Sequence, residues 1–132
     1  MVWNARSSES REDYLACIYQ LIANKGYARV ADIADSLTVA EPSVSAMIKR
    51  LAKKGYVKRE RYRGFTLTES GQAIANGILL RRRILTAFLK SLGLPQQVIR
   101  QDVHGLEHRL SEQTLQGLRR FLKTDVKTDS LS

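Results

Sequence analysis

A mainly α-helical fold is predicted for this chain of 132 residues. Apolar residues recur at helical spacing in several segments, and Gly or Pro residues separate most of these segments. Only two short runs, on either side of a turn that contains Gly64, are rich in β-prone residues. The single cysteine, Cys17, excludes an internal disulfide, and we expect it to be a small buried thiol. No apolar stretch approaches the ~20 residues that span a bilayer, so we expect a cytoplasmic protein without a membrane partner.

The first half of the chain predicts three helices followed by a hairpin. The third helix begins near Pro42, a residue suited to a first helical turn, and ends at Gly55. The β-prone runs 56–61 and 65–68 flank a turn at residues 62–64 and predict the hairpin. The order helix, helix, turn, helix, hairpin is that of a winged helix-turn-helix. The first two helices are expected from Ser8 or Ser10 to Gly26 and over Val30–Leu37, after an irregular stretch at residues 1–8.

The second half predicts helices alone. They are expected over residues 68–91, 96–110 and 111–122, and Ser111 with Thr114 forms an imperfect capping box for the last one. We therefore divide the chain into a winged helix-turn-helix domain, residues 1–72, and an all-helical domain, residues 73–132.

The charge of the chain indicates a polyanionic partner. Lys and Arg outnumber Asp and Glu by 22 to 13, which gives a net charge of +9. Eight of the basic residues and a single acid lie between Ser43 and Phe65, along the third helix and the hairpin. The major groove of DNA admits one such helix, and small residues near its start allow close approach to the bases. A solvated charged face is the alternative interpretation. The predicted DNA-binding residues are Arg29, Ser43, Ser45, Ala46, Lys49, Arg50, Lys53, Arg61 and Arg63.

Both histidines of the chain lie close together, in the run His104-Gly-Leu-Glu107-His108. On a helix, this spacing places His104, Glu107 and His108 on one face. Imidazole and carboxylate ligands suit a divalent transition metal, although a polar surface cluster would show the same spacing. The run also matches the inverted zinc-protease pattern, but a hydrolase leaves the basic hairpin unexplained. We therefore expect no enzyme.

Several motifs resemble the diphtheria-toxin-repressor family of metal-responsive regulators, in particular its manganese-sensing branch. The resemblance implies a homodimer in which residues 1–72 bind DNA and residues 73–132 form a dimerisation and metal-sensing domain. It also implies a repressor of metal-ion uptake genes that binds a palindromic double-stranded operator when metal is bound. The motifs are Glu12-Asp13-Tyr14-Leu15, Lys25-Gly26-Tyr27-Ala28-Arg29-Val30, Pro42-Ser43-Val44-Ser45, Tyr62-Arg63-Gly64, and Asp102 to Ser111.

The metal site that the resemblance implies is only partly present in this sequence. Asp13, Glu107 and His108 match ligand positions of the family. His104 falls where the manganese branch has a glutamate ligand, and histidine also binds metals. Ala16 replaces a further carboxylate, and Arg82 replaces a ligand histidine. Neither alanine nor a guanidinium group binds a metal.

Two hypotheses follow for the site. In the first, Asp13, His104, Glu107 and His108 hold one divalent ion, with Mn or Fe expected and Zn or Co also admitted by these ligands. In the second, Arg82 replaces the metal and its fixed charge pairs with Asp13 and Glu107. That regulator needs no cofactor, and it requires Arg82 to lie close to these carboxylates. The sequence is also compatible with a regulator that senses a small apolar ligand, and with a basic architectural protein that binds DNA without sequence preference.

Overall fold

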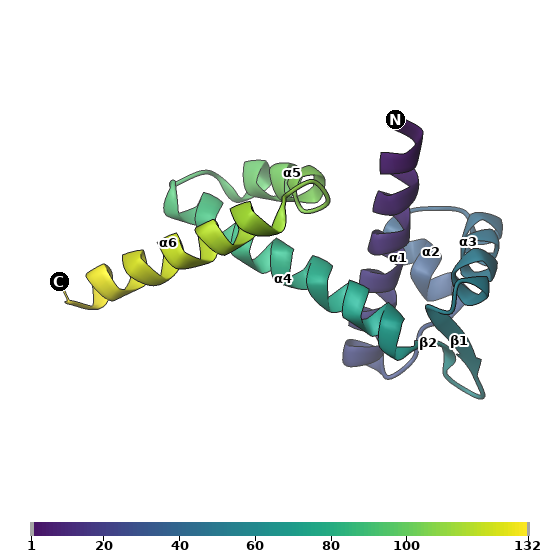
Figure 1. The fold of residues 1–132 in the computed structure, drawn as a ribbon. Coiled ribbons are helices and arrows are strands. Elements are labelled where there is room, and N and C mark those ends of the chain that lie inside the picture. The colour runs from purple at the N-terminus through teal and green to yellow at the C-terminus, as the bar shows by residue number, and fades with distance from the viewer. Residues whose placement is uncertain (1, 132) are drawn as a thin grey trace. The chain divides into compact units, whose positions relative to one another are not determined.

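The computed structural model describes the backbone of residues 2–131 and the side chains of residues 10–123. Contacts divide the chain into two units, of which the first ends at Gly77 and the second begins at Ile78. The mainly helical fold with a two-stranded hairpin is confirmed (Figure 1). The elements are α1 (Val2–Lys25), α2 (Val30–Leu37), α3 (Glu41–Lys53), β1 (Val57–Glu60), β2 (Gly64–Leu67), α4 (Glu69–Ser91), α5 (Gln96–Leu106) and α6 (Glu112–Leu131).

Helices α1 to α3, the hairpin and the start of α4 up to Gly77 form the first unit. Helix α1 packs against α2 and β2, α2 packs against α3, and α3 packs against β1 (Figure 1). Pro42 lies in the first turn of α3, where its missing N–H costs no hydrogen bond. The apolar faces of the helices meet in a core that shields them from water. Its fully buried side chains include Leu15, Ile18, Ile33, Val44 and Leu51.

The hairpin is fixed to the loop before α2 by backbone contacts. Strands β1 and β2 are antiparallel, with Val57 opposite Leu67 and Glu60 opposite Gly64. The Ala28 N–H donates to the Arg63 carbonyl oxygen at 3.0 Å, and the Phe65 N–H donates to the Ala28 carbonyl oxygen at 2.8 Å. A side chain at Gly64, where φ is +75°, would overlap that Ala28 carbonyl. Glycine is therefore required for this close approach.

In the described part of the second unit, residues 78–131, all regular elements are helices, as predicted. The part of α4 from Ile78 onward, α5 and α6 surround a small apolar core. Its buried members are Leu85, Leu89, Ile99 and Val103. Among the residues with described placement, no helix is both long and apolar enough to cross a membrane.

Three predicted helix ends are wrong. Helix α1 begins at Val2 instead of Ser8 or Ser10, since no Gly or Pro interrupts the chain there. Helix α6 continues to Leu131 instead of ending at Leu122, for the same reason. Helix α5 ends at Leu106, after Gly105, and not at Leu110. The capping role of Ser111 is confirmed, because its Oγ accepts the Thr114 N–H at 3.1 Å.

Candidate nucleic-acid interface and metal centre

Helix α3 presents one apolar and one polar face. Val44, Ile48 and Leu51 are buried against the core of the first unit. The opposite face is exposed, with small residues in the first turns and basic residues in the later turns. All six residues predicted on α3 to bind DNA lie on the exposed face: Ser43, Ser45, Ala46, Lys49, Arg50 and Lys53.

One of these residues lies beside α1. Burial raises the pKa of the Tyr14 phenol above its ordinary value, and the positive charge of Arg50 partly offsets this effect. Arg50 therefore acts on a buried side chain of α1 while it remains exposed on α3. Lys49 and Lys53 are exposed as well, so α3 carries three cations toward solvent.

The tip of the hairpin carries two exposed residues of different chemistry. Arg61 is exposed, and its guanidinium carbon lies 5.2 Å from the centre of the Tyr62 ring. The Tyr62 side chain is 79% exposed, and its backbone has a φ of +71°. No function was predicted for Tyr62 from the sequence, because its surroundings indicate only a turn before Gly64. Its position between two arginines was the only signal available.

Arg29 and Arg63, both predicted to bind DNA, are engaged inside the first unit. Arg29 donates from Nη2 to the carbonyl oxygen of Tyr62 at 3.0 Å. Arg63 donates from Nε to the Gly26 carbonyl oxygen at 3.1 Å and from Nη1 to Glu60 Oε2 at 3.2 Å. Both side chains thus tie the hairpin to the loop between α1 and α2. They remain partly exposed to solvent.

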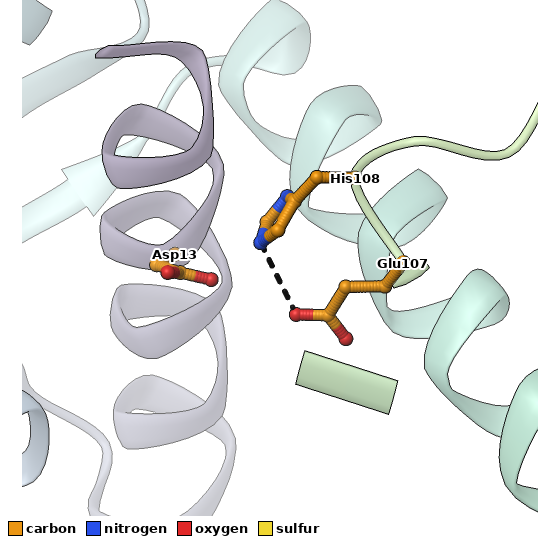
Figure 2. Close-up of side chains that lie close together, drawn as sticks. All are labelled: Asp13, Glu107 and His108. Atoms are coloured by element: carbon orange, nitrogen blue, oxygen red, sulfur yellow. Dashed lines mark ion pairs between the residues drawn. The ribbon is translucent and has the colours of Figure 1, made fainter. Parts of the chain in front are cut away.

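Glu107 and His108 come together directly after α5, in the second unit (Figure 2). The Glu107 side chain is 1% exposed and that of His108 is 2% exposed. Glu107 Oε2 accepts a hydrogen bond from Arg82 Nε at 2.7 Å. Glu107 Oε1 lies 3.4 Å from His108 Nε2. The two oxygens of one carboxylate therefore have different surroundings.

The surroundings of Glu107 Oε1 fit a bound divalent ion. This oxygen is buried and accepts no hydrogen bond from any described residue. A buried carboxylate oxygen that accepts no hydrogen bond carries a desolvation cost that a cation would offset. Two donors that share an ion through bonds of about 2.1 Å, at angles of about 90–109°, lie roughly 3.0–3.4 Å apart. The observed separation from His108 Nε2 lies at the upper end of that range.

The other residues predicted for the metal centre are placed differently. His104 is exposed on α5, with its ring centre 6.4 Å from that of His108, and it does not join Glu107 and His108. Asp13, also labelled in Figure 2, belongs to α1 in the first unit. Ala16 and Cys17 are buried in that unit, which confirms the expected buried thiol. Helix α5 ends at Leu106, so Glu107 caps the helix and His108 follows it in the chain, while His104 lies within the helix.

Family comparisons cover nearly the whole chain. Residues 7–65 match the domain described as iron dependent repressor, N-terminal DNA binding domain. Residues 68–129 match the domain described as iron dependent repressor, metal binding and dimerisation domain. The two matches fall on the winged helix-turn-helix and on the helices that follow it.

Curated relatives agree with these matches. The chain is 47% identical over 102 residues to a protein of Lysinibacillus sphaericus named HTH-type transcriptional regulator MntR, and the match covers 77% of this chain and 73% of the relative. It is 44% identical over 105 residues to a Bacillus subtilis protein of the same name, covering 80% of this chain and 74% of the relative.

Solved structures share the fold. The manganese regulator SloR superposes with a TM-score of 0.77 at 31% identity, covering 86% of this chain. IdeR of T. acidophilum gives a TM-score of 0.74 at 34% identity, covering 83% of this chain. This chain spans about half the length of both, 53% in each case. The chain therefore belongs to the iron-dependent repressor family, the family that its motifs resemble, whose members are metal-responsive DNA-binding regulators and not enzymes.

Proposed function

We propose that this chain is a cytoplasmic, homodimeric repressor of metal-ion uptake genes, which binds a palindromic double-stranded operator when it holds Mn(II) or Fe(II). Residues 1–72 form the DNA-binding part, and residues 73–132 form the part for dimerisation and metal sensing. The observation that carries the proposal is the buried Glu107–His108 pair, because it offers metal ligands in a chain of a metal-responsive family.

The DNA-binding part of the proposal uses the exposed face of α3. The small side chains of Ser43, Ser45 and Ala46 allow the first turns of α3 to approach base edges in the major groove. Basic residues further along α3 and at the hairpin tip then contact phosphates, which position the helix without reading sequence. The proposed phosphate contacts are Lys49, Arg50, Lys53 and Arg61. Arg29, from the loop before α2, and Arg63, from the turn of the hairpin, remain proposed contacts.

The metal part of the proposal assigns the ligands Asp13, His104, Glu107 and His108. Glu107 contributes Oε1, since Arg82 already bonds to Oε2. The Arg82 cation occupies part of the space and charge that a second ion would need, so we propose one ion per chain. Bound Mn(II) or Fe(II) supplies a divalent charge, and Zn(II) or Co(II) would also suit these ligands in vitro.

Coupling to DNA follows from the origin of the ligands. Asp13 belongs to the first unit, whereas the remaining proposed ligands belong to the second. A shared ion would restrict the spacing of the two α3 helices in a dimer. Half-sites lie about 34 Å apart, one helical turn of DNA. Restricting the free protein to that spacing raises its apparent affinity for the operator, because a larger fraction of the molecules is then able to bind DNA.

The hypothesis that Arg82 replaces the metal is supported by one observation. Arg82 Nε lies 2.7 Å from Glu107 Oε2, close enough for the fixed ion pair that this hypothesis needs. The pair leaves Glu107 Oε1 without a hydrogen-bond partner among the described residues. Membership of a family with a metal-binding domain favours the metal-responsive regulator.

Counting bound ions distinguishes these hypotheses. Metal-free protein is dialysed against Mn(II), and against Fe(II) without oxygen, and bound metal is measured per chain. We expect about one ion per chain for the unaltered protein, none for His108→Ala, and more than one for Arg82→His. Lys90→Ala, which alters an exposed lysine of the second unit, serves as the control. A folded dimer that binds no ion would overturn the metal site and support the Arg82 hypothesis.

A further inference from the structure

Tyr62 has a strained backbone conformation and a side chain that is exposed to solvent. Its φ of +71° lies in the left-handed region, which strains a bulky residue and favours Gly or Asn. Packing of the ring does not offset this strain, because the side chain is 79% exposed. Such strain persists at positions where function needs a particular side chain in a particular place.

Neighbouring residues hold the Tyr62 backbone in place. Arg29 Nη2 donates to the Tyr62 carbonyl oxygen at 3.0 Å. The next residue, Arg63, is anchored by its Nε to the Gly26 carbonyl oxygen at 3.1 Å. Gly64 then allows the strand to meet the Ala28 carbonyl directly. The turn is therefore fixed from three sides, while the ring itself points away from the core.

Positive charge surrounds the exposed ring. The Arg61 guanidinium carbon lies 5.2 Å from the ring centre. Arg29, Arg59 and Arg61 line the same surface groove as Tyr62. A flat ring between cations suits the minor groove of DNA, which is about 6 Å wide and strongly negative where it narrows. Arginine supplies the charge, and the ring supplies a rigid contact surface.

The phenol group adds a preference among base pairs. In the minor groove, A·T pairs present only acceptors, whereas G·C pairs add the amino group of guanine. A tyrosine hydroxyl donates to those acceptors, and the guanine amino group obstructs the approach. We infer that Tyr62 is a specificity-determining residue that enters the minor groove beside the α3 contact and selects A·T pairs there. The inference rests on the proposed DNA-binding function.

The experiment separates stability from recognition. Unaltered full-length protein with Mn(II) first selects its DNA from a random-sequence library. Melting temperature and affinity for the selected DNA are then measured for Tyr62→Gly, Tyr62→Phe and Thr38→Gly. Thr38 is the matched control, since it also has a positive φ, of 55°, and caps α2 away from the hairpin.

In Tyr62→Gly, relief of backbone strain should raise the melting temperature, whereas loss of the ring should lower the affinity for DNA. For Tyr62→Gly we expect a melting temperature that is unchanged or about 2–4 °C higher, with an affinity about tenfold lower. Thr38→Gly should show the same thermal shift with unchanged affinity. Tyr62→Phe should keep most of the affinity and lose the preference for A·T over G·C. Replacing guanine by inosine, which lacks the amino group, should restore binding of the unaltered protein.

Two results would overturn the inference, and they differ in what else they overturn. If Tyr62→Gly binds the selected DNA as tightly as the unaltered protein, Tyr62 makes no contact, while the proposed function stands. If the unaltered protein selects no sequence from the library, the proposed function and the role of Tyr62 are both wrong.

Discussion

The two oxygens of Glu107 illustrate how one side chain can serve two cations. Oε2 bonds to Arg82, and the buried Oε1 faces His108 without a hydrogen bond from any described group. An ion pair with one oxygen offsets only part of the cost of burying a carboxylate. A metal ion bound at the second oxygen would offset the remaining cost. Metal binding should therefore stabilise the folded protein.

Removal of His108 should abolish that stabilisation. Metal that binds only the folded state adds about 2.7 kcal/mol when its concentration is 100 times Kd. We expect Mn(II) to raise the melting temperature of the unaltered protein and to leave that of His108→Ala unchanged. His104→Ala should lose less of the shift, because His104 is exposed and lies apart from Glu107. Equal shifts in the unaltered protein and His108→Ala would remove His108 from the site.

Truncation of the α3 cations should weaken DNA binding. Lys49→Ala and Arg50→Ala each remove one exposed charge from the face that we assign to DNA. For a phosphate contact, the slope of log K against log salt should become shallower by about 0.9 for each variant. Lys90→Ala, in the second unit, should change neither affinity nor slope. Unchanged binding of both α3 variants would show that this face of α3 does not contact DNA phosphates.

The sequence predicts which side chains share one face of a helix better than it predicts contacts between residues far apart in the chain. The exposed face of α3 follows from its apolar spacing alone. The engagement of Arg63 with Gly26 does not, since the two residues are separated by 37 positions and meet only after folding. The positive φ of Tyr62 does not follow from the sequence either. Arg82 and Glu107 are 25 positions apart, and only the family resemblance connects them in the sequence.

At the scale of elements, the hairpin depends on a backbone contact that tolerates no side chain. Gly64→Ala would place a methyl group against the Ala28 carbonyl oxygen in a left-handed conformation. We expect a loss of about 2 kcal/mol or more in the free energy of unfolding. Gly77→Ala in α4 is the matched control, because nothing lies near its added Cβ. It should stabilise the protein by up to about 1 kcal/mol.

Urea unfolding of the two glycine variants tests this account of the hairpin. The difference between them separates the close contact at Gly64 from the general effect of adding a methyl group. If Gly64→Ala unfolds at the same urea concentration as the unaltered protein, the hairpin is not held by Ala28.

Element boundaries were predictable where a specific residue marks them. Helix α2 has the predicted bounds Val30–Leu37, and α4 ends at the predicted Ser91. Thr68 lies at the start of α4, where its Oγ1 accepts the Gly71 N–H at 3.2 Å. The end of α5 was missed because apolar spacing continues to Leu110 although the backbone leaves the helix after Leu106. Spacing alone does not reveal where intrahelical hydrogen bonding stops.

At the scale of the whole molecule, the net charge of +9 predicts DNA binding that weakens strongly as salt rises. A protein with 6–10 phosphate contacts loses about 10³–10⁵ in affinity between 50 and 200 mM salt. We expect affinities for selected and random DNA to fall together as salt rises, while their ratio stays well above one. Titration of both DNAs at several salt concentrations measures this ratio. A ratio near one throughout would indicate a basic architectural protein.

The central claim is that a bound metal ion controls operator binding. The most direct measurement is the affinity of the full-length protein for its selected DNA with and without Mn(II), at constant ionic strength, with His108→Ala in parallel. We predict that Mn(II) tightens binding by the unaltered protein at least about tenfold, equal to 1.4 kcal/mol, and leaves His108→Ala unchanged. Equal affinity of the unaltered protein in metal-free and Mn(II) buffers would contradict the account and favour a regulator in which Arg82 supplies a permanent charge.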